Sequence, residues 1–345
     1  MLTAPSLSYS LLAPMLIIFG GAVAGVLVEA FLAKTHRAAV QLTISVGALL
    51  LALQQLWRIR DLSSTTAAVN SVTIDKAGIF LQATVVLLAL VAVLLIADQD
   101  NFVAQASAVP GSSEEINALQ QKSQQTEIFP LFLFAVGGMM LFPVATDLIT
   151  LFVALEVFSL PLYLLAGLSR RKRLLSQEAA LKYFLLGAYA SAFFLFGAAF
   201  LYGYAGTISL SGISAAFGTA NEVFLLIGIV FVSVGLLFKI SAVPFHSWTP
   251  DVYQGAPTPI TAFMAACTKV AAFGAILRIF YVGFAESQTL WQPIITVIAI
   301  LTMIFGSIVA ITQRDIKRML AYSSIAHAGF LLSGVVALNK DGLAA

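Results

Sequence analysis

The 345-residue chain has very little charge. Only 10% of its residues are Asp, Glu, Lys or Arg, whereas water-soluble domains carry about 25%. Hydrophobic residues make up 60% of the sequence. This composition excludes an ordinary soluble domain and predicts a protein that crosses the lipid bilayer several times. The formal net charge of +2 is too small to indicate a nucleic-acid partner, and no nucleic acid is expected.

Cysteine and histidine are scarce as well. The single cysteine, Cys267, excludes an intrachain disulfide and a cysteine-ligated iron–sulfur cluster. The three histidines, His36, His246 and His327, are too widely spaced to suggest a metal site. No glycine-rich phosphate loop follows a strand pattern. We therefore expect no metal, nucleotide or redox cofactor in this chain itself.

Hydrophobic runs of spanning length predict an all-α, polytopic transmembrane bundle of about ten helices. The first run has no basic region before it and is long enough to span, which predicts a retained helix rather than a cleaved signal peptide. The expected helices cover residues 11–33, 37–57, 74–97, 127–145, 147–168, 177–204, 222–253, 257–282, 289–312 and 316–337.

Basic residues fall mainly on one side of this predicted bundle. Lys34 and Arg37 follow the first helix, and the run Arg170–Arg173 follows the fifth. The ninth helix is followed by Arg314, Lys317 and Arg318. Cytoplasmic loops carry an excess of Lys and Arg, so this side is predicted to be cytoplasmic. The N-terminus is then outside, and the protein is expected in the cell (inner) membrane.

Four regions follow from this pattern. Residues 1–97 form an N-terminal three-helix region, and residues 98–126 are a polar cytoplasmic loop with the composition of a flexible linker, which we expect to be poorly ordered. Residues 127–282 and 283–345 hold the remaining helices.

The seventh hydrophobic segment is too long for one straight helix. A helix from Glu222 to Tyr253 would be about 48 Å long, against a hydrocarbon core of about 30 Å. Pro244 cannot donate to the carbonyl of Ile240, which lies beside Lys239. We therefore predict a broken helix whose free backbone groups line a cavity or meet other protein.

Several ionisable residues lie within the hydrophobic segments. Glu156 is about 14 Å along its helix from Asp147, and Lys269 is about 18 Å from Pro257, so both are predicted near the bilayer midplane. A lysine at this depth costs on the order of 3 kcal/mol. Lys182 lies near the start of the sixth helix, Lys239 precedes the break, and His246 and His327 are weaker candidates.

Such groups are suited to proton transfer. Burial disfavours the charged form of both lysine and carboxylate, so each can gain or lose a proton near neutral pH. A pair of Glu156 with a lysine would then act as a switch. Simpler roles are also open: ion pairs that anchor helices, an interfacial position for Lys182, packing of His246 against Trp248, and helix packing by His327.

Four stretches of the sequence resemble a known family. The segment FKISAVPFHSWTPDVYQGAPTP is similar to the signature of the antiporter-like membrane subunits of respiratory complex I, most of all the N type (subunit 2). Related L and M types typically have histidine where this chain has Lys269. The other matching stretches are FVALEVFSLPLYLL, EAALKYFLLGAYASAFFLFG and QRDIKRMLAYSSIAHAGFLL.

The resemblance implies two inverted five-helix repeats, each with a broken helix and a buried lysine. The first repeat would cover residues 127–282, and residues 283–345 would be a partial second repeat of a C-terminally truncated chain. It implies a translocase subunit that couples electron transfer from NADH to quinone to proton pumping. The family residues correspond to Glu156, Lys182, Lys239 and Lys269.

The same resemblance places NAD(H), flavin, iron–sulfur clusters and quinone on partner subunits, both membrane and peripheral. Two alternatives remain at this point. A subunit of a multi-subunit cation/proton antiporter shares the same ancestry, and a truncated structural subunit would not pump.

Overall fold

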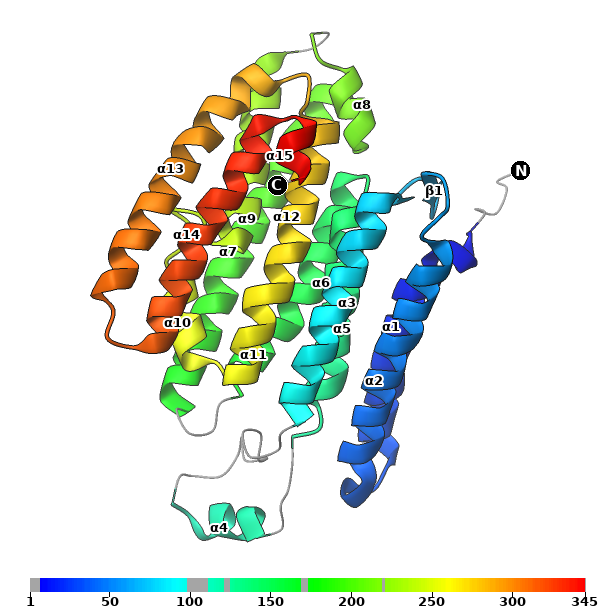
Figure 1. Ribbon diagram of the computed structural model, residues 1–345, viewed down its shortest axis with the longest axis vertical. Coiled ribbons are helices and arrows are strands. Elements are labelled where there is room, and N and C mark those ends of the chain that lie inside the picture. The colour runs from blue at the N-terminus through cyan, green and yellow to red at the C-terminus, as the bar shows by residue number, and fades with distance from the viewer. Residues whose placement is uncertain (1–6, 98–110, 121–124, 169–172, 219–220, 345) are drawn as a thin grey trace.

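The computed structural model describes residues 7–97, 111–120, 125–168, 173–218 and 221–344, and these residues are mainly helical (Figure 1). Among them, nine helical segments are long and apolar enough to cross a membrane. They are α1 (Tyr9–Phe31), α2 (Lys34–Ile59), α3 (Lys76–Ala97), α6 (Leu148–Ala166), α7 (Arg173–Ala205), α9 (Glu222–Ile240), the segment Thr258–Gly283, α13 (Gln288–Thr312) and α14 (Ile316–Ala337).

The segment Thr258–Gly283 is not a uniform helix. It consists of α11 (Thr258–Phe263), the π-helical turn η3 (Met264–Thr268), α12 (Lys269–Arg278) and a second π-helical turn, η4 (Ile279–Gly283). Such turns add a residue to the helical ladder and are frequent at functional sites. The first turn ends directly before Lys269.

The predicted all-α membrane bundle is confirmed. The expected helix over 127–145 is short, because α5 (Ile128–Leu141) gives way to the 3-10 turn η2 (Phe142–Val144), which contains Pro143. The predicted break in the seventh segment is also present: α9 ends at Ile240, and α10 (Trp248–Gly255) follows.

Four short elements complete the described structure. They are α4 (Ser113–Gln120), α8 (Leu210–Ala215), α15 (Lys340–Ala344) and a hairpin of β1 (Thr65–Ala67) with β2 (Val72–Ile74). The helix α4 lies inside the linker that we predicted to lack structure. The rest of that linker, apart from the residues next to α4 and α5, lies outside the described residues, as do Arg170, Arg171 and Lys172 of the predicted basic loop.

Close packing of small residues brings neighbouring helices together. A side chain at Gly197 of α7 would lie 2.6 Å from the backbone nitrogen of Val232 of α9. A side chain at Gly306 of α13 would lie equally close to the backbone nitrogen of Ala326 of α14. Lipid offers no hydrophobic drive for helix association, so such close approach is what holds membrane helices together.

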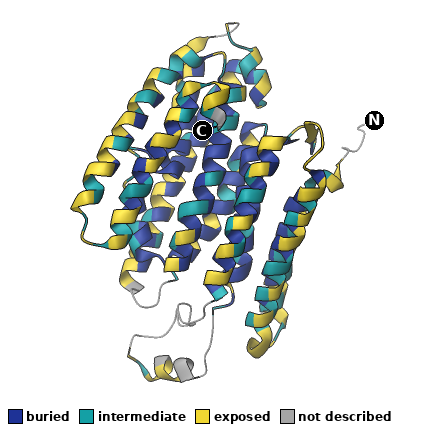
Figure 2. Ribbon diagram, in the orientation of Figure 1, coloured by how far each residue is buried: buried dark blue, intermediate teal, exposed yellow. Residues whose placement is uncertain are grey.

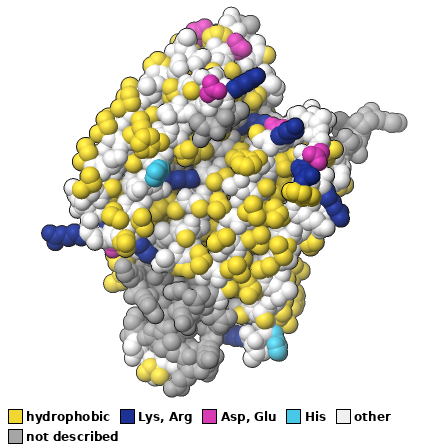
Figure 3. Space-filling view, viewed as in Figure 1, with side chains coloured by type: hydrophobic (Ala, Val, Ile, Leu, Met, Phe, Trp, Pro, Cys, Tyr) yellow, Lys and Arg dark blue, Asp and Glu magenta, His cyan; other side chains and the backbone are white. Residues whose placement is uncertain are grey.

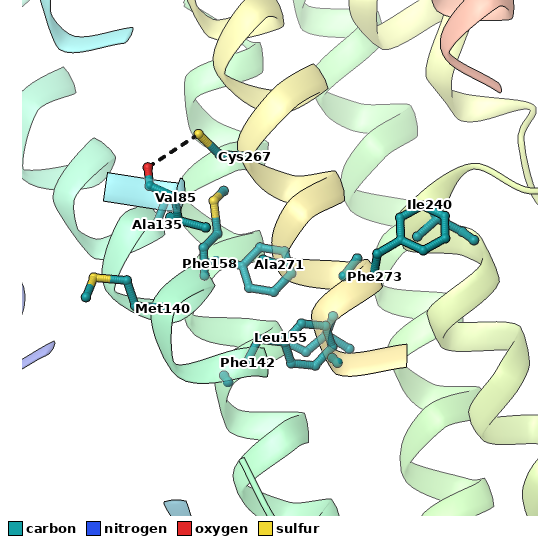
Figure 4. Close-up of a cluster of buried hydrophobic side chains, with 14 of the residues drawn as sticks. Val85, Ala135, Met140, Phe142, Leu155, Phe158, Ile240, Cys267, Ala271 and Phe273 are labelled. Carbon is teal, nitrogen blue, oxygen red and sulfur yellow. Dashed lines mark hydrogen bonds between the residues drawn. The ribbon is translucent and has the colours of Figure 1, made fainter. Parts of the chain in front are cut away.

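The buried core lies where α3, α5, α6, α9 and α12 meet, whereas α1 and α2 lie at one side (Figures 1 and 2). Figure 3 shows that hydrophobic side chains cover much of the outer face and that charged ones are few. Within the core, Leu155 and Phe158 of α6 belong to the same cluster as Ala271 of α12, and the thiol of Cys267 points to the carbonyl of Val85 (Figure 4).

An ion pair joins the start of α3 to the end of α12. Arg278 donates to both oxygens of Asp75, at 2.6 and 3.1 Å, and to the carbonyl of Pro143 at 3.1 Å. Burial raises the pKa of Asp75, but the hydrogen bonds and charge of Arg278 outweigh burial and hold the pKa below its usual range. This pair fixes the hairpin end of α3 against the segment that carries Lys269.

Candidate functional site

The break between α9 and α10 is closed by hydrogen bonds that do not depend on a continuous helix. Ser241 adopts a left-handed conformation with φ of 66°, which ends α9. The indole of Trp248 donates to the carbonyl of Phe238 at 3.0 Å, and Thr249 donates to the hydroxyl of Ser241 at 2.6 Å. The carbonyl of Phe238 thus finds a partner inside the protein, as a membrane environment requires of backbone groups at a helix break.

Lys239 is enclosed at this break. Its side chain leaves the last turn of α9, the residue is only 3% exposed, and its Nζ donates to Oγ of Ser159 on α6 at 2.7 Å. Four aromatic rings surround the amine with their centroids 5.2 to 5.9 Å away. We call them the Lys239 cage, and they are Phe158, Tyr163, Tyr183 and Phe238.

Glu156 lies on the same helix as the serine that holds Lys239. Residues three and seven positions apart share one face of a helix, so Glu156, Ser159 and Tyr163 form a row along α6. Glu156 interacts electrostatically with Lys239. In the described part of the chain, however, no ion pair joins them, and Oε1 of Glu156 is buried without a hydrogen-bond partner. The expected pair is replaced by a lysine–serine contact.

Lys269 occupies a second buried position. The residue is 9% exposed, and its amine donates to the carbonyl of Ser324 on α14. Its helix, α12, packs against both α9 and α14. Lys239 and Lys269 therefore lie on adjacent helices, each bonded to a neutral oxygen.

Lys182 lies apart from both. Its amine pairs with Glu178 at 2.6 Å and with Asp251 of α10 at 2.8 Å, and its side chain is 40% exposed. Asp251 also pairs with Arg318 of α14 at 2.6 Å. The neighbouring residue Tyr183 points into the Lys239 cage instead, because successive helical residues face different directions.

The two histidines differ in their surroundings. The half-buried ring of His246 packs against Phe305 of α13, with centroids 4.7 Å apart, and lies near Tyr322 of α14. Packing of His246 against Trp248 was one of the roles that the sequence left open. Trp248 instead stacks on Phe238 and Tyr183. His327 is exposed, and its ring lies 6.2 Å from that of Phe330.

Comparison with known proteins identifies the family. A family model described as NADH:quinone oxidoreductase/Mrp antiporter, transmembrane, matches residues 145–345. NADH-quinone oxidoreductase subunit N of Rhodococcus opacus (strain B4) is 54% identical over 367 residues, which cover 99% of this chain and 68% of the relative. The chain belongs to the subunit N family of NADH-quinone oxidoreductases.

Further relatives support membership of the subunit N family. The protein of that name from Mycobacterium tuberculosis (strain H37Rv) is 52% identical over 100% of this chain and 69% of its own length. A chain of respiratory complex I from Thermus thermophilus with bound aureothin has a TM-score of 0.75 at 33% identity, covering 94% of this chain and 65% of that one.

A chain of the Mrp complex from Dietzia sp. has a TM-score of 0.79 at 21% identity, over 98% of this chain and 60% of that one, which shows the fold alone. This member of the subunit N family spans about two thirds of the length of its relatives.

Sequence reasoning missed several residues of this subunit N site. Four of them are neutral, and the two charged ones lie near the ends of predicted helices, so the cost of burying a charge did not single any of them out. The spacing of Glu156, Ser159 and Tyr163 was a usable signal, because it places them on one helical face. The missed residues are Ser159, Tyr163, Tyr183, Asp251, Arg318 and Ser324.

Proposed function

We propose that this chain is a proton-translocating membrane subunit of an NADH:quinone oxidoreductase. The observation that carries the proposal is the enclosure of Lys239 in an apolar core, at a helix break, with a serine in place of a carboxylate as its direct partner. Burying a lysine in this way is costly, and in membrane proteins such residues mark ion paths. Membership of the subunit N family supports the same function.

Each candidate residue has a role in this proposal. Glu156 and Lys239 form the switch beside the break, and Lys269 is the next proton carrier, toward α14. Lys182, paired with Asp251, is the exchange point nearer the surface. His246 is a further candidate because its Nδ1 is buried and lacks a hydrogen-bond partner within the described residues. The exposed position of His327 gives it the least support.

The remaining assignments are part of the same proposal. NAD(H), flavin, iron–sulfur clusters and quinone are used by partner membrane and peripheral subunits. The chain lies in the cell (inner) membrane with its N-terminus outside. Residues 127–282 act as one antiporter-like repeat, residues 283–345 as part of a second, and residues 1–97 as a separate three-helix region.

The decisive experiment changes the buried charges in the assembled complex. Lys239→Ala and Glu156→Ala are each expected to leave assembly intact and to lower NADH-driven proton pumping at least tenfold, which corresponds to about 1.4 kcal/mol or more in the barrier. Pumping is measured in vesicles by the quenching of a pH-sensitive dye. The control is Lys34→Ala, which removes an exposed lysine.

The two alternatives give different results. A structural subunit predicts normal pumping by Lys239→Ala, while deletion of the chain disrupts the complex. A cation/proton antiporter subunit predicts that the chain is absent from the band with NADH dehydrogenase activity on a non-denaturing gel. Normal pumping by both variants would overturn the site assignment.

A further inference from the structure

Two possible acceptors for the Lys239 amine lie on α6, Ser159 and Glu156, and the amine donates only to Ser159. Ser159 donates its own hydroxyl proton to the carbonyl of Leu155, so its oxygen is left to accept from the lysine. Glu156, one turn earlier on α6, has a buried Oε1 without a hydrogen-bond partner among the described residues. An ammonium group normally pairs with a carboxylate when one is near, yet here Lys239 donates to the neutral hydroxyl of Ser159.

The Lys239 cage explains how a cation is held there without a carboxylate. A lysine ammonium has three donors, and Ser159 takes one of them. Ring faces attract a cation through their quadrupole but carry no counter-charge. With four such rings within 6 Å, the pocket stabilises a lysine that is charged but not ion-paired.

We propose that Ser159 and the Lys239 cage form a holding site, and that the lysine alternates between this site and Glu156. This inference rests on the proposed function. Ser159 is a positioning residue, since it acts through Lys239. On Glu156 the ammonium is stabilised by an opposite charge, and in the holding site it is stabilised less. Movement from the carboxylate to Ser159 therefore promotes release of the lysine's proton.

The described groups around Lys239 fit this two-position scheme. Facing it are Glu156 and Tyr163 of α6 and Tyr183 of α7. Helix α12, which also packs against α9, contributes Lys269 and Arg278, and these are bonded elsewhere, to Ser324 and to Asp75. Helix α13 carries no Asp, Glu, Lys, Arg or His. Glu156 is thus the carboxylate that competes with Ser159.

The test is the pH profile of pumping by the Ser159→Ala complex in liposomes. Without the serine oxygen, Lys239 rests on Glu156, and its proton is lost only at higher pH. Proton pumping per NADH oxidised should therefore fall off at a pH higher by about one unit or more than in wild type. Ser159→Thr keeps the hydroxyl and should restore the wild-type profile.

A matched control is Ser191→Ala on α7, which removes a buried hydroxyl without a partner among the described residues and should leave the profile unchanged. A Ser159→Ala profile that superimposes on wild type, or moves toward lower pH, overturns the holding site. If Ser159→Ala does not assemble, Ser159→Cys, with its weaker acceptor, is measured against the same criterion.

The outcome separates this inference from the function on which it rests. If Lys239→Ala pumps normally, the proposed function of the site fails. If Lys239→Ala stops pumping while Ser159→Ala behaves as wild type, the holding site alone is wrong.

Discussion

Asp75, which lies just before α3, shows how a single ion pair depends on pH. Its pKa is held below the usual range by Arg278, so the pair stabilises the fold above the unfolded-state pKa of about 3.9 and is lost as pH falls through the lower folded-state value. Asp75→Asn keeps an oxygen for the backbone nitrogen of Gly78 but removes the charge. We expect it to cost about 2 kcal/mol at neutral pH.

The measurement is the thermal stability of the detergent-solubilised complex, followed through the fraction of this chain that stays soluble after heating. The difference in thermal stability between Asp75→Asn and wild type should be full at pH 7. It should narrow as the pH falls below about 4 and disappear below the lower folded-state pKa, where the wild-type pair is lost. A gap that is independent of pH would show that the charge of Asp75 is not what stabilises the structure.

Individual charged residues could be located from the sequence, but their partners could not. Lys239 and Lys269 stand out because a lysine inside an apolar run is costly to bury wherever its helix packs. The choice between Glu156 and Ser159 as the partner of Lys239 depends on how α6 and α9 are rotated against each other. No local pattern encodes that rotation.

At the scale of elements, the ion pairs of Asp251 tie the second half of the broken helix to two others. The carboxylate receives Lys182 from α7 and Arg318 from α14. Asp251→Asn removes the charge that both cations share, and Glu178→Gln, the matched control, removes one pair within α7. Because these side chains are partly exposed, we expect a loss of about 1 kcal/mol for Asp251→Asn and less for the control.

The difference in stability loss between Asp251→Asn and Glu178→Gln should shrink at high salt, since salt screens partly exposed ion pairs. It is measured as the shift in thermal stability of the solubilised complex at two ionic strengths. A control variant that destabilises as much as Asp251→Asn would contradict the inter-helix role of this carboxylate.

Some secondary-structure elements could be predicted from the sequence and others could not. The break after Lys239 was predictable because the segment is too long for the bilayer and contains Pro244. The hairpin of β1 and β2 was not, because its strands are only three residues long. The π-helical turn before Lys269 was missed as well, since a one-residue insertion in a helix leaves its apolar pattern almost unchanged.

At the scale of the whole molecule, the distribution of basic residues predicts an orientation that can be tested. Thr35, in the first turn of α2, should be cytoplasmic, and Ser64, beside the β-hairpin, should be outside. Both are exposed, whereas the native Cys267 is buried. A membrane-impermeant maleimide should label Ser64→Cys in intact cells and label Thr35→Cys only after lysis. The reverse labelling would invert the proposed topology.

The hydrogen bonds across the helix break have a mechanical consequence. The hydrogen bonds of Trp248 and Thr249 hold the start of α10 against the end of α9, so the two half-helices form one rigid unit. Lys239 lies in the first half-helix and Asp251 in the second. A displacement of α10 would therefore be transmitted to the end of α9 that carries the buried amine.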